Sequence, residues 1–117
     1  MKKILIVEDD TSIRELLVEI FESEGYLVDS SVNGSEAILS LETNIPDIIL
    51  MDVMMPIMDG FAFRIEQMKN PLWNSIPVVA MSAQDQGLEK LSDFGITNFI
   101  NKPLELNHLL ETVRTLS

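Results

Sequence analysis

Acidic side chains follow two apolar runs of this sequence, where buried strands would end. Glu8, Asp9 and Asp10 come directly after "ILIV", and Asp52 follows "IILM". Carboxylates that share one crevice repel one another and cannot all stay ionised cheaply without a cation. Oxygen ligands with open positions favour Mg²⁺, which takes one or two carboxylates and leaves room for phosphate oxygens and water. The acidic residues therefore predict a magnesium site.

Two further apolar runs end in residues that suit phosphate chemistry. Ser82 and Ala83 follow "VVAM", and Lys102 with Pro103 follows "NFIN". A carboxylate beside Mg²⁺, a lysine and a hydroxyl donor is the equipment for phosphoryl transfer, because metal and ammonium neutralise charge on the moving group. This set predicts that Asp52 is a nucleophile.

Short continuous apolar runs are typical of parallel strands that are covered on both faces. The more polar "YLVDSSV" suits an edge strand. The expected strands lie at 4–7, 26–32, 48–51, 78–81 and 98–101.

Helical patterns separate the expected strands. Five apolar residues between positions 13 and 21 follow the spacing of one buried helix face, with Ser12 and Glu15 at the spacing of a capping box and Gly25 as the stop. The five residues are Ile13, Leu16, Leu17, Ile20 and Phe21. The other expected helices lie at 34–42, 61–69, 86–94 and 106–116.

Five strands that alternate with five helices predict an α/β fold with a parallel sheet. We expect a flavodoxin-like, doubly wound sheet of order 2-1-3-4-5 within a single domain, residues 1–117. Ligands in such sheets bind beyond the carboxyl ends of the strands, at the point where the strand order reverses. Strands one and three are neighbours there, so Glu8, Asp9 and Asp52 should converge.

Charge and composition exclude several classes of partner. The 117 residues include 19 acidic and 8 basic ones, for a net charge of −11. Nucleic-acid affinity depends on neutralising phosphates with Lys and Arg, so direct DNA or RNA binding is not expected, and the charge also opposes an anionic membrane. The sequence has no cysteine and no apolar run of about 20 residues. No signal-peptide core is present, and we expect a soluble, cytoplasmic protein.

Four stretches carry a resemblance to a known family: "ILIVEDD", "PDIILMDVMMPIMDG", "IPVVAMSA" and "NFINKPLE". In this order and spacing, the chain resembles a response-regulator receiver domain of two-component signalling, similar to a stand-alone chemotaxis regulator. The resemblance implies that Asp52 is the phosphoacceptor, which takes its phosphoryl group from a histidine kinase or a histidine phosphotransfer protein. It also implies an unknown downstream protein target.

The resemblance implies roles for the residues around Asp52. Glu8 and Asp9, with Asp52 and the backbone carbonyl of Met54, match the ligands of Mg²⁺. The family usually has a cis peptide at the position of Lys102–Pro103. The residues that match the phosphate-binding and switch positions are Ser82, Ala83, Lys102 and Phe99.

Other interpretations stay open at this point. Phe99 is equally well explained as a core aromatic residue, and it lacks the hydroxyl group that a tyrosine would carry. The segment 82–102 is short for the family, and no effector domain follows, which fits a stand-alone regulator or a piece trimmed from a larger one. The main rival function is a degenerate receiver that acts as a phosphorylation-independent interaction module. A flavin carrier is disfavoured, because "EDD" would repel a flavin phosphate.

Three isolated features have ordinary structural interpretations. His108 has no evident partner and is expected on the surface, and Trp73 is expected to be only partly covered there. The methionines near Asp52 are expected to fill packing space rather than bind a soft metal, because their surroundings are rich in oxygen. They are Met51, Met54, Met55 and Met58.

Overall fold

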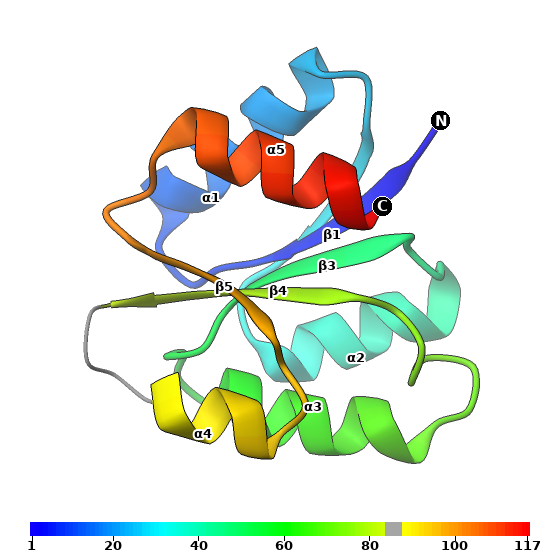
Figure 1. Ribbon diagram of the computed structural model, residues 1–117. Coiled ribbons are helices and arrows are strands. Elements are labelled where there is room, and N and C mark those ends of the chain that lie inside the picture. The colour runs from blue at the N-terminus through cyan, green and yellow to red at the C-terminus, as the bar shows by residue number, and fades with distance from the viewer. Residues whose placement is uncertain (84–87) are drawn as a thin grey trace.

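The protein is a five-stranded parallel sheet with helices on both faces, as Figure 1 shows for the computed structural model. The structure describes residues 1–83 and 88–117. The strand order is β2-β1-β3-β4-β5, which confirms the predicted fold class and order. The strands are β1 (Lys3–Val7), β2 (Leu27–Ser31), β3 (Ile48–Asp52), β4 (Val78–Ala83) and β5 (Asn98–Lys102). The helices are α1 (Thr11–Ser23), α2 (Gly34–Thr43), α3 (Gly60–Lys69), α4 (Leu88–Asp93) and α5 (Leu106–Leu116).

Alternating side chains of the central strands build two hydrophobic cores. Leu5 and Val7 of β1 lie in the core that α2, α3 and α4 cover. Ile4 and Ile6 of the same strand lie in the core under α1 and α5. Figure 1 shows these two helix layers above and below the sheet. Because both faces are covered, the central strands read as continuous apolar runs in the sequence.

The first helix begins earlier than the capping-box prediction requires. Asp10 is its N-cap, and the Asp10 side chain accepts a hydrogen bond from the Ile13 amide. The prediction that Ser12 and Glu15 form a capping box is therefore wrong, because an aspartate two residues upstream already satisfies the free amide. Leu16 is also exposed, although its spacing predicted burial.

The second and third helices also begin at side-chain caps. Asn33 accepts a hydrogen bond from the Glu36 amide, and Asp59 accepts one from the Ala62 amide. These caps fix where the chain turns after β2 and β3. The predicted helix at 86–94 starts outside the described residues, and its described part is α4.

The burial of two aromatic residues, Trp73 and Phe99, differs from the interpretation of the sequence. Trp73 has only 8% of its surface exposed and belongs to the core beneath α2 and α3, so the prediction of partial surface packing is wrong. The Trp73 carbonyl accepts a hydrogen bond from buried Gln67 of α3, which joins this segment to the helix. Phe99 is 40% exposed, so the interpretation of Phe99 as a core residue is also wrong. His108 is exposed as predicted.

Within the described residues, every helix is too short or too polar to cross a membrane.

Candidate functional site

The sheet register brings two acidic strand ends together. Val7 of β1 pairs with Met51 of β3, so Glu8 and Asp52 follow side by side. Carboxylate oxygens of Glu8, Asp9 and Asp52 lie within 4.8 Å of one another. Glu8 and Asp52 are buried, whereas Asp9 is exposed. The arrangement is an acidic cluster with one side open to solvent.

The Lys102 ammonium reaches this cluster from β5. Its Nζ lies 3.0 Å from Asp52 Oδ2 and 3.2 Å from Glu8 Oε1. Both carboxylate side chains are almost fully buried, and the lysine side chain is 25% exposed. A single ammonium therefore serves two buried carboxylates.

The pKa values of Glu8 and Lys102 are both raised at the site, for different reasons. The pKa of Glu8 is raised from its ordinary value of 4.5 to about 7. Burial is the main cause and repulsion from Asp52 adds to it, while the hydrogen bond from the Asp10 amide and the charge of Lys102 oppose them. Burial alone would lower the pKa of Lys102, but its contacts with Asp52 and Glu8 outweigh this and raise it. An additional cation would relieve the acidic cluster.

Backbone groups fix the orientation of the two buried carboxylates. The Asp10 amide donates to Glu8 Oε2 at 3.1 Å, and the Met54 amide donates to Asp52 Oδ1 at 3.1 Å. Arg14 of α1 donates to the backbone carbonyl of Glu8 at 2.9 Å. Sequence reasoning missed Arg14, although it lies one helical turn after the Asp10 cap and so faces the loop that carries Glu8 and Asp9.

Other candidate residues lie at the ends of β4 and β5. Ser82 is buried, and its hydroxyl donates to the Ala83 carbonyl at 3.0 Å. Ala83 pairs with Lys102 in the ladder between β4 and β5, so this strand end adjoins the lysine. The Lys102–Pro103 peptide bond is cis. Phe99 pairs with Ala80 further back along the sheet, away from the strand ends where the acids lie.

Comparison with known proteins shows the family of this chain. Residues 4–114 match the family described as the response regulator receiver domain. The chain belongs to this family. It is thus a receiver domain of two-component response regulators, a class of signalling proteins.

Individual relatives agree with this assignment. The receiver domain is 32% identical over 116 residues to the response regulator MprA of Mycobacterium sp. (strain KMS), covering 97% of this chain and 50% of MprA. It therefore spans half the length of that relative. The solved signal receiver domain of a signal transduction histidine kinase from Syntrophus aciditrophicus has a TM-score of 0.92 and 34% identity, with 99% and 89% of the two chains covered.

Another similar solved structure contains a magnesium ion. The receiver domain of sensor histidine kinase PA1611 from Pseudomonas aeruginosa PAO1 has a magnesium ion coordinated in its active site cleft. It has a TM-score of 0.91 and 26% identity to this receiver domain, and the match covers 98% of this chain and 96% of that one.

Proposed function

We propose that Asp52 accepts a phosphoryl group from a phosphohistidine and that this modification switches the binding of a protein partner. An Asp52 carboxylate oxygen attacks phosphorus, and a new P–O bond forms. The bond from phosphorus to the donor imidazole breaks, and its electron pair returns to the imidazole nitrogen. The product is an aspartyl phosphate, and the donor histidine takes up a proton from solvent. Catalysis extends only to the domain's own phosphorylation and dephosphorylation.

The donor set fits Mg²⁺. Glu8, Asp9, Asp52 and the backbone carbonyl of Met54 would hold the ion, since hard oxygen ligands with open positions are what it prefers. When bound, it supplies positive charge beside the phosphoryl oxygens. Burial and repulsion from Asp52 raise the pKa of Glu8, and a bound cation would oppose both effects by favouring the ionised carboxylate.

Lys102 and Ser82 act on the phosphoryl group after transfer. The Lys102 ammonium, 3.0 Å from Asp52, pairs with a phosphoryl oxygen. The Ser82 hydroxyl turns from the Ala83 carbonyl toward the phosphate, together with the Ala83 amide. This rearrangement alters the space beside β4, and Phe99 then moves inward, so a local charge change biases a two-state element.

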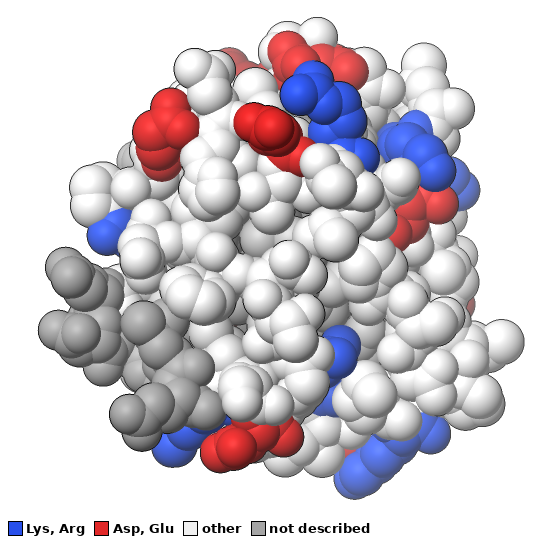
Figure 2. Space-filling view, viewed as in Figure 1, with Lys and Arg blue, Asp and Glu red and all other residues white. Residues whose placement is uncertain are grey.

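A face around Phe99 suits a protein partner. Figure 2 shows mostly uncharged side chains over the middle of the face where Figure 1 has α5 above β5 and α4 below it. Charged side chains gather at its edges, although the chain carries a net charge of −11. We assign the downstream protein to this face and the histidine kinase or phosphotransfer protein to the open side of the acidic cluster, in the cytoplasm.

The observation that carries this proposal is the pairing of one ammonium with Asp52 and Glu8 at 3.0 and 3.2 Å. The test is the intact mass of the protein after incubation with Mg²⁺ and acetyl phosphate. We expect one added phosphoryl group, which chelator abolishes and Asp52→Asn prevents. The exposed Asp29→Asn on β2 is the matched control and should be modified like the wild type. A wild-type mass that stays unchanged supports the rival interpretation, a phosphorylation-independent interaction module.

A further inference from the structure

The loop between β3 and α3, residues 53–59, contains a tight and strained turn. The Met58 amide donates to the Pro56 carbonyl at 2.8 Å, and the intervening Ile57 has φ +70°. This three-residue turn with positive φ is rare and strained, above all for a β-branched residue. Ile57 is 86% exposed, so packing of its side chain does not compensate the strain. Another contact must hold the turn.

Gly34, the first residue of α2, makes that contact. Its amide donates to the Met58 carbonyl at 2.9 Å. A Cβ at Gly34 would lie 2.8 Å from Met58 O, 2.8 Å from Met58 Cγ and 3.1 Å from Met58 Sδ. The backbone oxygen cannot move away as a flexible side chain can. Only glycine permits this close approach between α2 and the loop.

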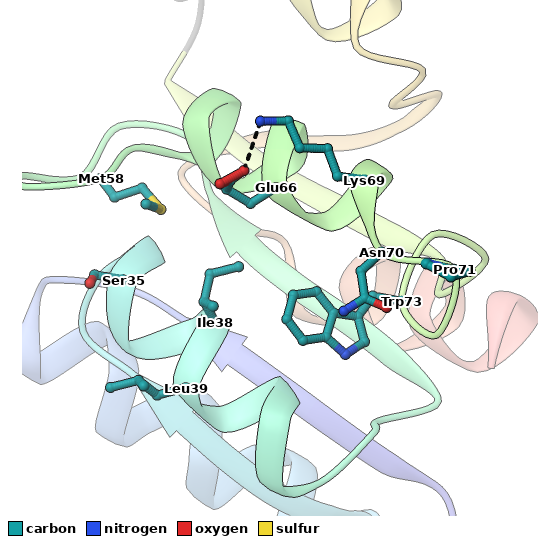
Figure 3. Close-up of a pocket in the computed structure, with 9 residues that line it drawn as sticks. All are labelled: Ser35, Ile38, Leu39, Met58, Glu66, Lys69, Asn70, Pro71 and Trp73. Carbon is teal, nitrogen blue, oxygen red and sulfur yellow. Dashed lines mark ion pairs between the residues drawn. The ribbon is translucent and has the colours of Figure 1, made fainter.

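The Met58 side chain lies in the groove between α2 and α3. Figure 3 shows it near Ser35 and Ile38 at one end of this groove, with Trp73 at the other. The Met58 side chain therefore lies beside α2, and the Met58 carbonyl accepts a hydrogen bond from the first residue of the same helix. Any shift of α2 against the loop is passed to Met58 at both points.

The same loop carries Met54, whose backbone carbonyl is a proposed magnesium ligand. At its start the loop is fixed by the Met54 amide on Asp52 Oδ1 and by the Gly60 amide on the Val53 carbonyl at 2.9 Å. The Gly34–Met58 contact joins its far end to a different element. Residues that orient the ligands of a metal typically change metal affinity by about 10- to 100-fold when they are altered.

We propose that Gly34 is a positioning residue for the magnesium site: its contact with Met58 holds the β3–α3 loop and thereby the Met54 carbonyl. This rests on the proposed function, because Met54 is a ligand only if the acidic cluster binds Mg²⁺. It also explains what β2 contributes to the site. No charged residue follows β2 at this edge of the sheet, but the chain after β2 places Gly34 in contact with the β3–α3 loop.

Gly34→Ala tests this positioning role. Alanine has a higher helix propensity than glycine, so if Gly34 only starts α2, the variant should melt at a higher temperature and bind Mg²⁺ like the wild type. If Gly34 positions the loop, the added Cβ pushes Met58 away. We then expect Mg²⁺ affinity, measured by calorimetric titration, to fall about tenfold. Amide exchange of residues 54–58 in chelator should also become faster.

Two further variants complete the experiment. Ser35→Ala, the next residue of α2, has no hydrogen bond to the loop among the described contacts and should match the wild type in both measurements. Gly34→Ala with Met58→Ala removes two of the three closest atoms, so its Mg²⁺ affinity should lie between those of the wild type and the single variant. This partial rescue distinguishes displacement of Met58 from general loss of structure, and it remains measurable if the single variant folds poorly.

The outcomes separate the positioning role from the proposed function. Unchanged Mg²⁺ affinity and unchanged exchange in a folded Gly34→Ala protein would overturn the positioning role alone. A wild type that binds no Mg²⁺ would overturn the proposed function and this role as a metal-positioning device together. Faster exchange of residues 54–58 in the variant would then identify Gly34 only as a structural contact of the loop.

Discussion

The Lys102 ammonium lies 3.0 Å from Asp52 Oδ2. The same nitrogen also contacts Glu8 Oε1 at 3.2 Å, so the lysine already offsets part of the repulsion in the acidic cluster. Phosphorylation of Asp52 would therefore redirect an existing ion pair rather than recruit a distant cation. A metal ion bound at the acidic cluster would therefore act on the same carboxylates as the lysine.

Lys102→Ala should separate metal binding from the response to phosphorylation. Removing the ammonium strengthens the negative field at the cluster, so we expect Mg²⁺ affinity to stay equal or rise, by about tenfold at most for one charge at a partly exposed site. The change in amide exchange near Phe99 on adding Mg²⁺ and acetyl phosphate should be lost. Lys69→Ala, which removes an exposed lysine paired with Glu66, is the control. A large loss of Mg²⁺ affinity in Lys102→Ala would contradict this role for the lysine.

The pKa of Glu8 predicts how stability depends on pH without metal. Burial raises it from 4.5 to about 7, so the folded protein binds more protons than the unfolded chain between these values. The free energy of unfolding should therefore fall as pH rises from about 4.5 to 7, by at most about 3 kcal/mol. Urea unfolding in chelator at several pH values measures this dependence.

The variant Glu8→Gln isolates the Glu8 contribution to that pH dependence. This variant should reduce the fall in the free energy of unfolding between pH 5 and 7. Glu36→Gln, at an exposed position of α2, should leave that fall unchanged. Saturating Mg²⁺ should also reverse the trend in the wild type, because the metal binds the ionised carboxylate and stabilises the folded state by mass action. Equal pH dependence in Glu8→Gln and the wild type would show that Glu8 titrates at its ordinary pKa.

Ile57→Gly should stabilise the metal-free protein. A non-glycine residue in the left-handed region costs about 1–2 kcal/mol, and the greater chain entropy of glycine in the unfolded state offsets about half of this gain. We expect a net gain of about 0.5–1 kcal/mol in urea unfolding. The matched control is Ile57→Ala, which removes the branched side chain but keeps the unfavourable φ. A gain of the same size in both variants would assign the effect to the exposed side chain.

Much of the site follows from the sequence because it depends on strand ends. Runs such as "IILM" mark strands covered on both faces, and the order of a doubly wound sheet then determines which ends are neighbours. The proximity of Glu8, Asp9 and Asp52 needed no information beyond this. The reach of Lys102 could also be anticipated, since it follows the last strand and has a long side chain.

Several individual contacts, both local and between distant segments, did not follow from the sequence. The capping-box spacing of Ser12 and Glu15 is a local signal, but Asp10 forms the cap. The side-chain amide of buried Gln67 donates to the Trp73 carbonyl, and a sequence pattern gives no such pairing. The approach of Gly34 to Met58 likewise joins the start of α2 to the β3–α3 loop, two segments far apart in the chain.

Arg64 of α3 is a buried cation that joins α3 to the segment after α4. It is only 8% exposed, has no acidic partner among the residues that the structure describes, and its pKa is lowered by burial. Its guanidinium donates to the carbonyls that follow α4, Phe94 at 2.9 Å and Gly95 at 3.3 Å. A third bond runs to Gln67 Oε1 at 2.8 Å. Arg64 thus binds the end of α4 to α3.

Arg64→Met should fill similar space without these donors and leave the carbonyl oxygens without partners. We expect a loss of about 2–3 kcal/mol in urea unfolding, the scale for buried polar groups that lose a charged partner. Amide exchange of residues 90–96 should become faster than that of the central strands. Arg114→Met, at an exposed position near the end of α5, should change neither measurement. If Arg64→Met is as stable as the wild type and its exchange at 90–96 is unchanged, the contacts of Arg64 do not hold α4 in place.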